Sequence, residues 1–178
     1  EFHQIAGRAG RAGFDTVAAH YPGGAISPVY VIVTSDGPIL DDTRLDAIDH
    51  LTDTLRGMPG VAQVRSVTQP AGEPLTTENL ASITGGATDL GALGIDPATT
   101  DVAPLMQALS SPEGLRLTGP LLRQYPQITE RLGLLLGNDE RTTRLIVALD
   151  GNPYENRALD VIRDVGPVTH AALEGSAL

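Results

Sequence analysis

The sequence predicts an α+β domain in which two β-α units build a ferredoxin-like, split β-α-β sheet, with a largely helical insertion between them. Three observations support this prediction. An uncharged, β-branched run covers residues 28–34, an apolar stripe at helical spacing follows it, and the same succession returns after residue 141. A chain of 178 residues buries enough surface for one such domain with its insertion.

The first half covers residues 28–75. The strand at 28–34 should be central, because neither of its faces carries a charge. The helix after it should begin at an N-cap, Asp41, and end at Gly57. A second strand is expected over residues 61–68. The predicted apolar face of the helix is made of Leu45, Ile48, Leu51, Leu55 and Met58.

The second half covers residues 141–178. It begins with a predicted strand at 142–149. Asn152 is the expected N-cap of the next helix, because a proline follows it directly and a glutamate stands three positions later. That helix should end at Gly166. Its predicted buried face is made of Ala158, Val161, Ile162 and Val165.

The two halves align without a gap, which indicates an internal duplication. Ile32 and Val33 match Ile146 and Val147, and the leading Leu-Asp pairs of the two helices match at the same offset. Convergence is the alternative, because any strand–turn–helix unit favours such residues. The same sequence separation between the two halves places the strand that would match the second strand, residues 61–68, at the very end of the chain. We therefore expect the last strand to be cut short.

Two segments stand apart from these halves. Residues 1–27 predict a flexible N-terminal segment with a short helix. Residues 76–140 form the insertion, which is weakly structured to about residue 100 and then helical over 102–109 and 111–136, with a kink or break at Pro126. An apolar stripe follows the second helix. The simpler interpretation is packing on the domain's own sheet, and the alternative is an exposed face for an acyl chain or a partner, made of Leu121, Tyr125, Ile128, Leu132 and Leu135.

The composition excludes several classes of function. A formal net charge of −10 argues against nucleic acid, because phosphate contacts need clustered Lys and Arg. Cysteine is absent, and the four histidines have no metal-ligand spacing. Five aspartates are expected to form a solvated helix face: Asp41, Asp42, Asp46, Asp49 and Asp53. We find no catalytic constellation, and we expect no enzyme, no cofactor and no metal.

Both ends of the chain resemble the second extracytoplasmic domain of the MmpL family, a branch of the RND superfamily of transporters. The strongest match begins with Met58-Pro59-Gly60-Val61 and continues through Val64, Val67-Thr68, Pro70, Gly72 and Pro74-Leu75. Tyr21-Pro22-Gly23-Gly24 is similar to the family's entry to the first strand. Arg144, Val147 and Leu149 are similar to its late strand.

The resemblance implies a porter-type domain on the periplasmic side of the inner membrane, in a proton-driven exporter of cell-envelope lipids. It implies three partners: a sister periplasmic domain, the envelope lipid and flanking transmembrane helices. The proton-relay carboxylates of such transporters lie in those helices, so no relay residue is carried over to this chain. A structural or protein-interaction module without substrate contact is the alternative, and an α/β enzyme is a third class.

Overall fold

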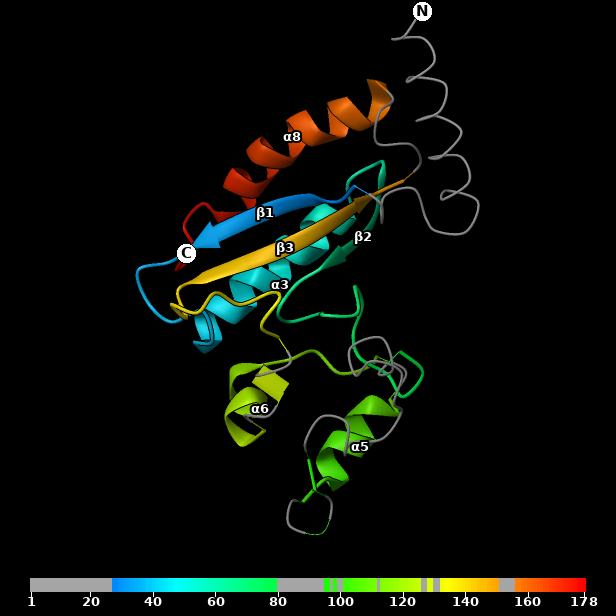
Figure 1. Cartoon of the computed structure of the whole chain (residues 1–178), viewed down its shortest axis with the longest axis vertical. Coiled ribbons are helices and arrows are strands. Elements are labelled where there is room, and N and C mark those ends of the chain that lie inside the picture. The colour runs from blue at the N-terminus through cyan, green and yellow to red at the C-terminus, as the bar shows by residue number, and fades with distance from the viewer. Residues whose placement is uncertain are drawn as a thin grey trace, which may run out of the picture.

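A computed structural model describes residues 27–79, 95–96, 98, 101–111, 113–125, 128–129, 132–150 and 156–178. The elements in chain order are β1 (Val29–Thr34), α3 (Asp42–Arg56), β2 (Val61–Arg65), α5 (Ala103–Leu109), α6 (Gly119–Gln124), β3 (Thr142–Leu149) and α8 (Asn156–Leu173) (Figure 1). The fold is mixed α+β, and the described residues contribute one antiparallel sheet of three strands and four helices.

The described sheet has the order β1-β3-β2, with β3 in the centre, so the prediction that the strand at 28–34 is central is wrong. Val31 of β1 lies opposite Leu145 of β3, and Val64 of β2 lies opposite Val147. Both outer strands run antiparallel to β3, so β1 and β2 are parallel to each other although they do not pair. The prediction that the strands at 29–34 and 144–149 lie in one sheet is confirmed.

One face of the sheet is covered by α3 and α8. Alternate residues of each strand point toward the helices, and the apolar side chains from all five elements form one core: Val31, Val33, Leu51, Leu55, Val64, Leu145, Val147, Leu149, Ala158, Val161 and Val165. The other residues of β1 point away from this core, and Tyr30 and Ile32 are more than half exposed. The helix faces are as predicted, except that Ile162 is 39% exposed.

Helix α3 joins two cores. Its C-terminal half, with Leu51 and Leu55, packs on the sheet, whereas Leu45 and Ile48 pack on the insertion. The predicted ends are confirmed, because the Asp41 carboxylate accepts a hydrogen bond from the Thr43 backbone N–H at 3.2 Å and Gly57 follows the last turn. A helix shared in this way fixes where the insertion sits relative to the sheet.

Two predicted boundaries are wrong. The strand predicted to reach residue 68 ends at Arg65, because Ser66 and Gln69 exchange both of their backbone hydrogen bonds and close a tight turn. Helix α8 does not end at Gly166 but continues through Pro167 to Leu173. Apolar residues of this added length pack on the sheet core, and that packing outweighs the poor helix propensity of Gly and Pro.

The insertion lies at the end of the molecule away from α8 (Figure 1). The helix predicted over residues 111–136, with a kink or break at Pro126, is much shorter than expected. Only α6 (Gly119–Gln124) and residues 128–129 are helical among the described residues of this range, and turns occupy residues 132–135. The shorter helix predicted at 102–109 is confirmed as α5. A backbone bridge between Leu75 and Leu115 ties the start of the insertion to its middle.

Some predictions fall on residues outside those that the structure describes. These are the N-terminal segment before residue 27, most of the weakly structured part of the insertion, and the Asn152 N-cap of α8. The residues after α8, at 174–178, are described and form no strand. The expected last strand is therefore not seen as a paired strand in the described sheet.

Candidate functional site

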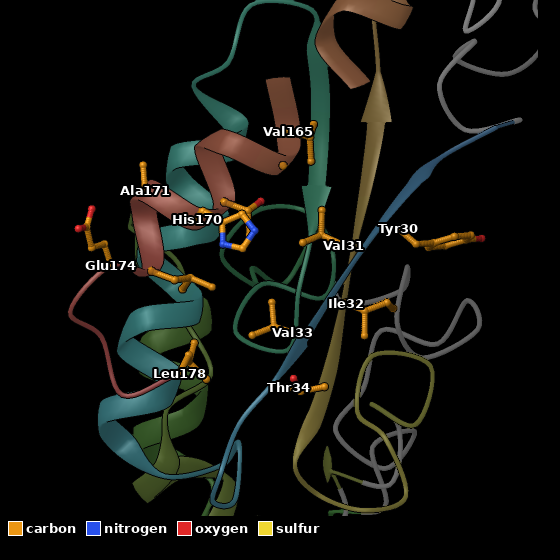
Figure 2. Close-up of a pocket in the computed structure, with 13 residues that line it drawn as sticks. Tyr30, Val31, Ile32, Val33, Thr34, Val165, His170, Ala171, Glu174 and Leu178 are labelled. Atoms are coloured by element: carbon orange, nitrogen blue, oxygen red, sulfur yellow. The ribbon is translucent and has the colours of Figure 1, made fainter. Parts of the chain in front are cut away.

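A hollow in the described surface lies along β1, which is an edge strand of the described sheet. We name it the β1 groove. It has a volume of about 850 Å³ and is bounded by residues 30–34, by the second half of α8 and by Leu178. Figure 2 shows Val31 and Val33 pointing toward the α8 side of the strand, whereas Tyr30 and Ile32 point to the opposite side.

The α8 wall of the groove combines apolar and polar groups. Val165 and Leu173 contribute apolar surface, His170 lies in the last turn of α8, and Glu174 follows the end of the helix (Figure 2). The hydroxyl oxygen of Thr169 is buried and has no hydrogen-bond partner among the described residues. Such orphaned groups are uncommon, because each forfeits its hydrogen bonds to water. The wall of the groove therefore includes a buried hydroxyl without a hydrogen-bond partner among the described residues.

A second feature is a charged cluster between α3 and the insertion. Arg116 donates to Asp49 and, at 2.9 Å, to Asp53 of α3. The Gln69 amide donates to the same two carboxylates, at 2.7 Å and 3.2 Å, and accepts a hydrogen bond from Arg56. Every carboxylate of this cluster has a cationic or amide partner, so its main effect is to hold the insertion against α3.

The environment shifts the pKa values in this cluster. Burial opposes the charge on Asp53, but hydrogen bonds from Arg116 and Gln69 outweigh it and hold the pKa of Asp53 below its ordinary value. For Arg116, burial again opposes the charge, and the bonds to Asp53 and Asp49 raise its pKa. Both shifts favour the ion pair. A general acid or base would instead need a pKa moved toward neutrality, so these shifts do not indicate acid–base catalysis.

A cavity of about 430 Å³ lies beside the cluster, between α3 and the segment that leads into α6. Leu45 and Leu117 line it together with the carboxylates of Asp42 and Asp46. Asp42 is paired with Arg123 at 3.1 Å. Within the described ranges, no group of three or more His, Asp or Glu side chains is placed to hold a metal ion.

The residues predicted to contact lipid or a partner are packed inside the molecule. Tyr125, Ile128, Leu132 and Leu135 are buried, and Leu121 is half-buried against the same core. The Tyr125 hydroxyl donates to the Asp101 carbonyl at 2.7 Å, so its polar tip is satisfied internally. The alternative of an exposed face is therefore wrong. The stripe is part of a core, as the simpler interpretation held, although it packs with other insertion residues and with α3 rather than mainly on the sheet.

Sequence reasoning missed both features described above. The expected solvated face of α3 holds for Asp46, but Asp49 and Asp53 are paired with Arg116 across a long sequence separation that no local pattern encodes. The β1 groove depends on α8 passing Gly166, which was not predicted. Its one sequence signal is the gapless repeat, which predicts a strand after the second helix.

No family model matches the chain, and no curated protein matches it either. Among the helices that the structure describes, none has both the length and the apolar character needed to cross a membrane. The function is therefore inferred from the fold and the residues alone.

Proposed function

We propose that this chain is a periplasmic porter domain of an RND-type, proton-driven exporter of cell-envelope lipids, similar to the MmpL family. One observation carries the proposal. β1 and β3 lie side by side and antiparallel, and each leads to a helix on the same face of the sheet. This is the arrangement expected of a ferredoxin-like, split β-α-β unit with one strand absent, and porter domains of the resembled family are built on that unit.

The family-like residues occupy positions that support this proposal. Met58 and Val61 pack partly on the sheet core, and Gly60 between them adopts a positive φ of 92° as the chain turns from α3 into β2. Farther along the match, Val67 is fully buried and Leu75 forms the bridge at the base of the insertion. The segment that resembles the family thus spans the junction between sheet and insertion, where its residues pack in the cores and form the turn and the bridge.

The proposed partners are a sister periplasmic domain, the exported lipid and flanking transmembrane helices. A domain of this kind acts by binding and relative movement, and we propose no enzyme activity, cofactor or metal. Tyr30 and Ile32, on the second face of the sheet, are exposed apolar side chains that a neighbouring domain would cover. The Arg144 guanidinium lies 5.1 Å from the Tyr30 ring centre, so this face also carries a cation–π pair.

The test uses the full-length protein in its own host. Val147→Asp places a charge in the central strand and should unfold the domain, because a buried unpaired charge is costly. We expect one class of envelope lipid to disappear from the cell surface and accumulate inside, as measured by mass spectrometry of surface and whole-cell extracts. Leu134→Ala, at an exposed position of the insertion, is the matched control. An unchanged lipid profile with Val147→Asp would reject the proposal.

A structural or protein-interaction module of an envelope membrane protein is the second candidate. The observation that favours it is the burial of Tyr125, Ile128 and Leu132, which removes the apolar face first considered for lipid contact. A photoactivatable lipid in membranes that contain the full-length protein distinguishes the two. Crosslinks within this domain support the porter role. If lipid export requires the domain but the lipid does not crosslink to it, the interaction module is supported.

A further inference from the structure

The open edge of β1 carries unpaired backbone groups. The Ser35 N–H donates to the Arg141 carbonyl at 2.9 Å, in register with the β1–β3 ladder. Hydrogen-bonded and outward-facing residues alternate along an antiparallel strand. The N–H and C=O groups of Tyr30, Ile32 and Thr34 therefore point away from β3, and no described residue pairs with them.

Helix α8 leaves room beside this edge. A side-chain Cβ built on Gly166 would meet no atom within 4 Å. The next turn of the helix brings the unpartnered Thr169 hydroxyl to the wall of the groove. A row of outward backbone donors and acceptors beside an apolar wall forms a site for an extended backbone rather than for a compact ligand.

In the first half of the molecule, the position that corresponds to the β1 groove is occupied by a strand. There, β2 pairs with the edge of β3 and packs against α3, and its central residue Val64 is fully buried. The gapless repeat of the sequence aligns β1 with β3 and α3 with α8. On that alignment, a counterpart of β2 would lie in the β1 groove, antiparallel to β1, and no described strand fills that position.

We propose that the β1 groove binds an extended polypeptide strand, which pairs antiparallel with β1 and points alternate apolar side chains under α8. The occupant is β2-like in chemistry, with small or β-branched apolar residues and no acidic residue. A neutral or basic strand suits the groove, because Glu174 lines it and the formal net charge of the chain is −10. This proposal stands on the open edge and the duplication, and it holds whether or not the domain acts in lipid export.

The test uses a synthetic probe copied from the first half. A capped, fluorescent peptide with the sequence of residues 60–66 is titrated into the 178-residue protein, and binding is followed by fluorescence anisotropy. We expect saturable binding. A peptide with Asp in place of its Val64 should bind about tenfold more weakly or worse, because a carboxylate would be buried under α8.

Two protein variants alter opposite walls of the groove. Ile32→Pro removes one outward N–H, and proline is tolerated where an edge N–H faces solvent. Gly166→Leu fills the open space on α8 with a better helix former. Each should weaken peptide binding by about tenfold, the size expected for one lost backbone hydrogen bond or a blocked site. Asp164→Leu, on an exposed turn of α8 outside the groove, should bind as the unaltered protein does.

Circular dichroism melts establish that each variant is folded. If the Ile32→Pro variant is unfolded, peptide binding by the Gly166→Leu variant alone tests the proposal. The proposal is overturned if the unaltered protein does not bind the peptide saturably, or if a folded Gly166→Leu variant binds it undiminished. It is also overturned if sedimentation shows a dimer that peptide does not dissociate and Gly166→Leu does, because a second copy would then occupy the groove.

Discussion

Arg116 Nη1 lies 2.9 Å from Asp53 Oδ2, although the two residues are 63 positions apart in the sequence. The same nitrogen also contacts Asp49, one turn earlier on α3. This pairing links the insertion to the helix that carries both cores. The geometry of the insertion therefore depends on a small charged cluster as well as on apolar packing.

Replacing Arg116 with Ala should destabilise the domain by about 1 kcal/mol. Exposed ion pairs contribute roughly 0–1 kcal/mol each, but here one guanidinium serves two carboxylates that would repel each other without it. Urea unfolding measures the change. Arg163→Ala is the control, because its pair with Asp160 is highly exposed and within one helix. If the two variants lose equal stability, the cluster does not hold the insertion.

The lowered pKa of Asp53 predicts sensitivity to acid. A carboxyl group with a lowered pKa in the folded state stabilises the protein at pH values above its ordinary pKa. This contribution is lost as the pH falls through the pKa of the folded state. Unfolding free energy should therefore fall with decreasing pH below about pH 4. Asp53→Asn should flatten that fall. A variant with the same pH profile as the unaltered protein would assign the acid sensitivity to other carboxylates.

Two glycines separate backbone strain from packing. Gly60 and Gly175 both have positive φ, at 92° and 77°, so Ala at either position pays roughly 1–2 kcal/mol of strain. A Cβ at Gly60 would also lie 2.8 Å from Val161 Cγ2, whereas one at Gly175 meets no atom within 4 Å. Gly60→Ala should therefore be the more destabilising by about 1 kcal/mol or more in thermal unfolding. Equal losses would mean that α8 does not pack closely on the turn at Gly60.

Leu51 tests the sheet core. It is fully buried between α3 and the sheet, and Leu51→Ala should cost roughly 2–5 kcal/mol by removing apolar contacts and leaving a cavity. Leu159→Ala, at a half-exposed position of α8, should change stability by less than about 0.5 kcal/mol. Denaturant midpoints of the two variants give the comparison, and a silent Leu51→Ala would contradict the core as described.

The strands and the core face of α3 could be predicted because their information is local. The β-branched run of β1 is typical of a strand in any context. The buried face of α3 follows from the helical spacing of its apolar residues, Leu45, Ile48, Leu51 and Leu55. The buried face of α8 was predicted for the same reason, and Ile162 was placed wrongly because a stripe of four positions defines the edge of a face poorly.

The remaining features depend on distant parts of the chain. The end of β2 is set by a buried turn in which the Ser66 hydroxyl accepts from the Gln69 N–H, and the continuation of α8 past Gly166 is set by packing on the sheet. The pairing of Arg116 with α3 joins segments that no repeat or motif relates. The groove beside β1 follows from the duplication only once the course of α8 is known.

The proposed porter role is tested most directly by reading the gene on both sides of the codons for Glu1 and Leu178. The account predicts an open reading frame that continues in both directions into segments of about 20 apolar residues, long enough to cross a membrane, with at least one carboxylate among them for the proton relay. A reading frame with no such segment on either side would contradict it.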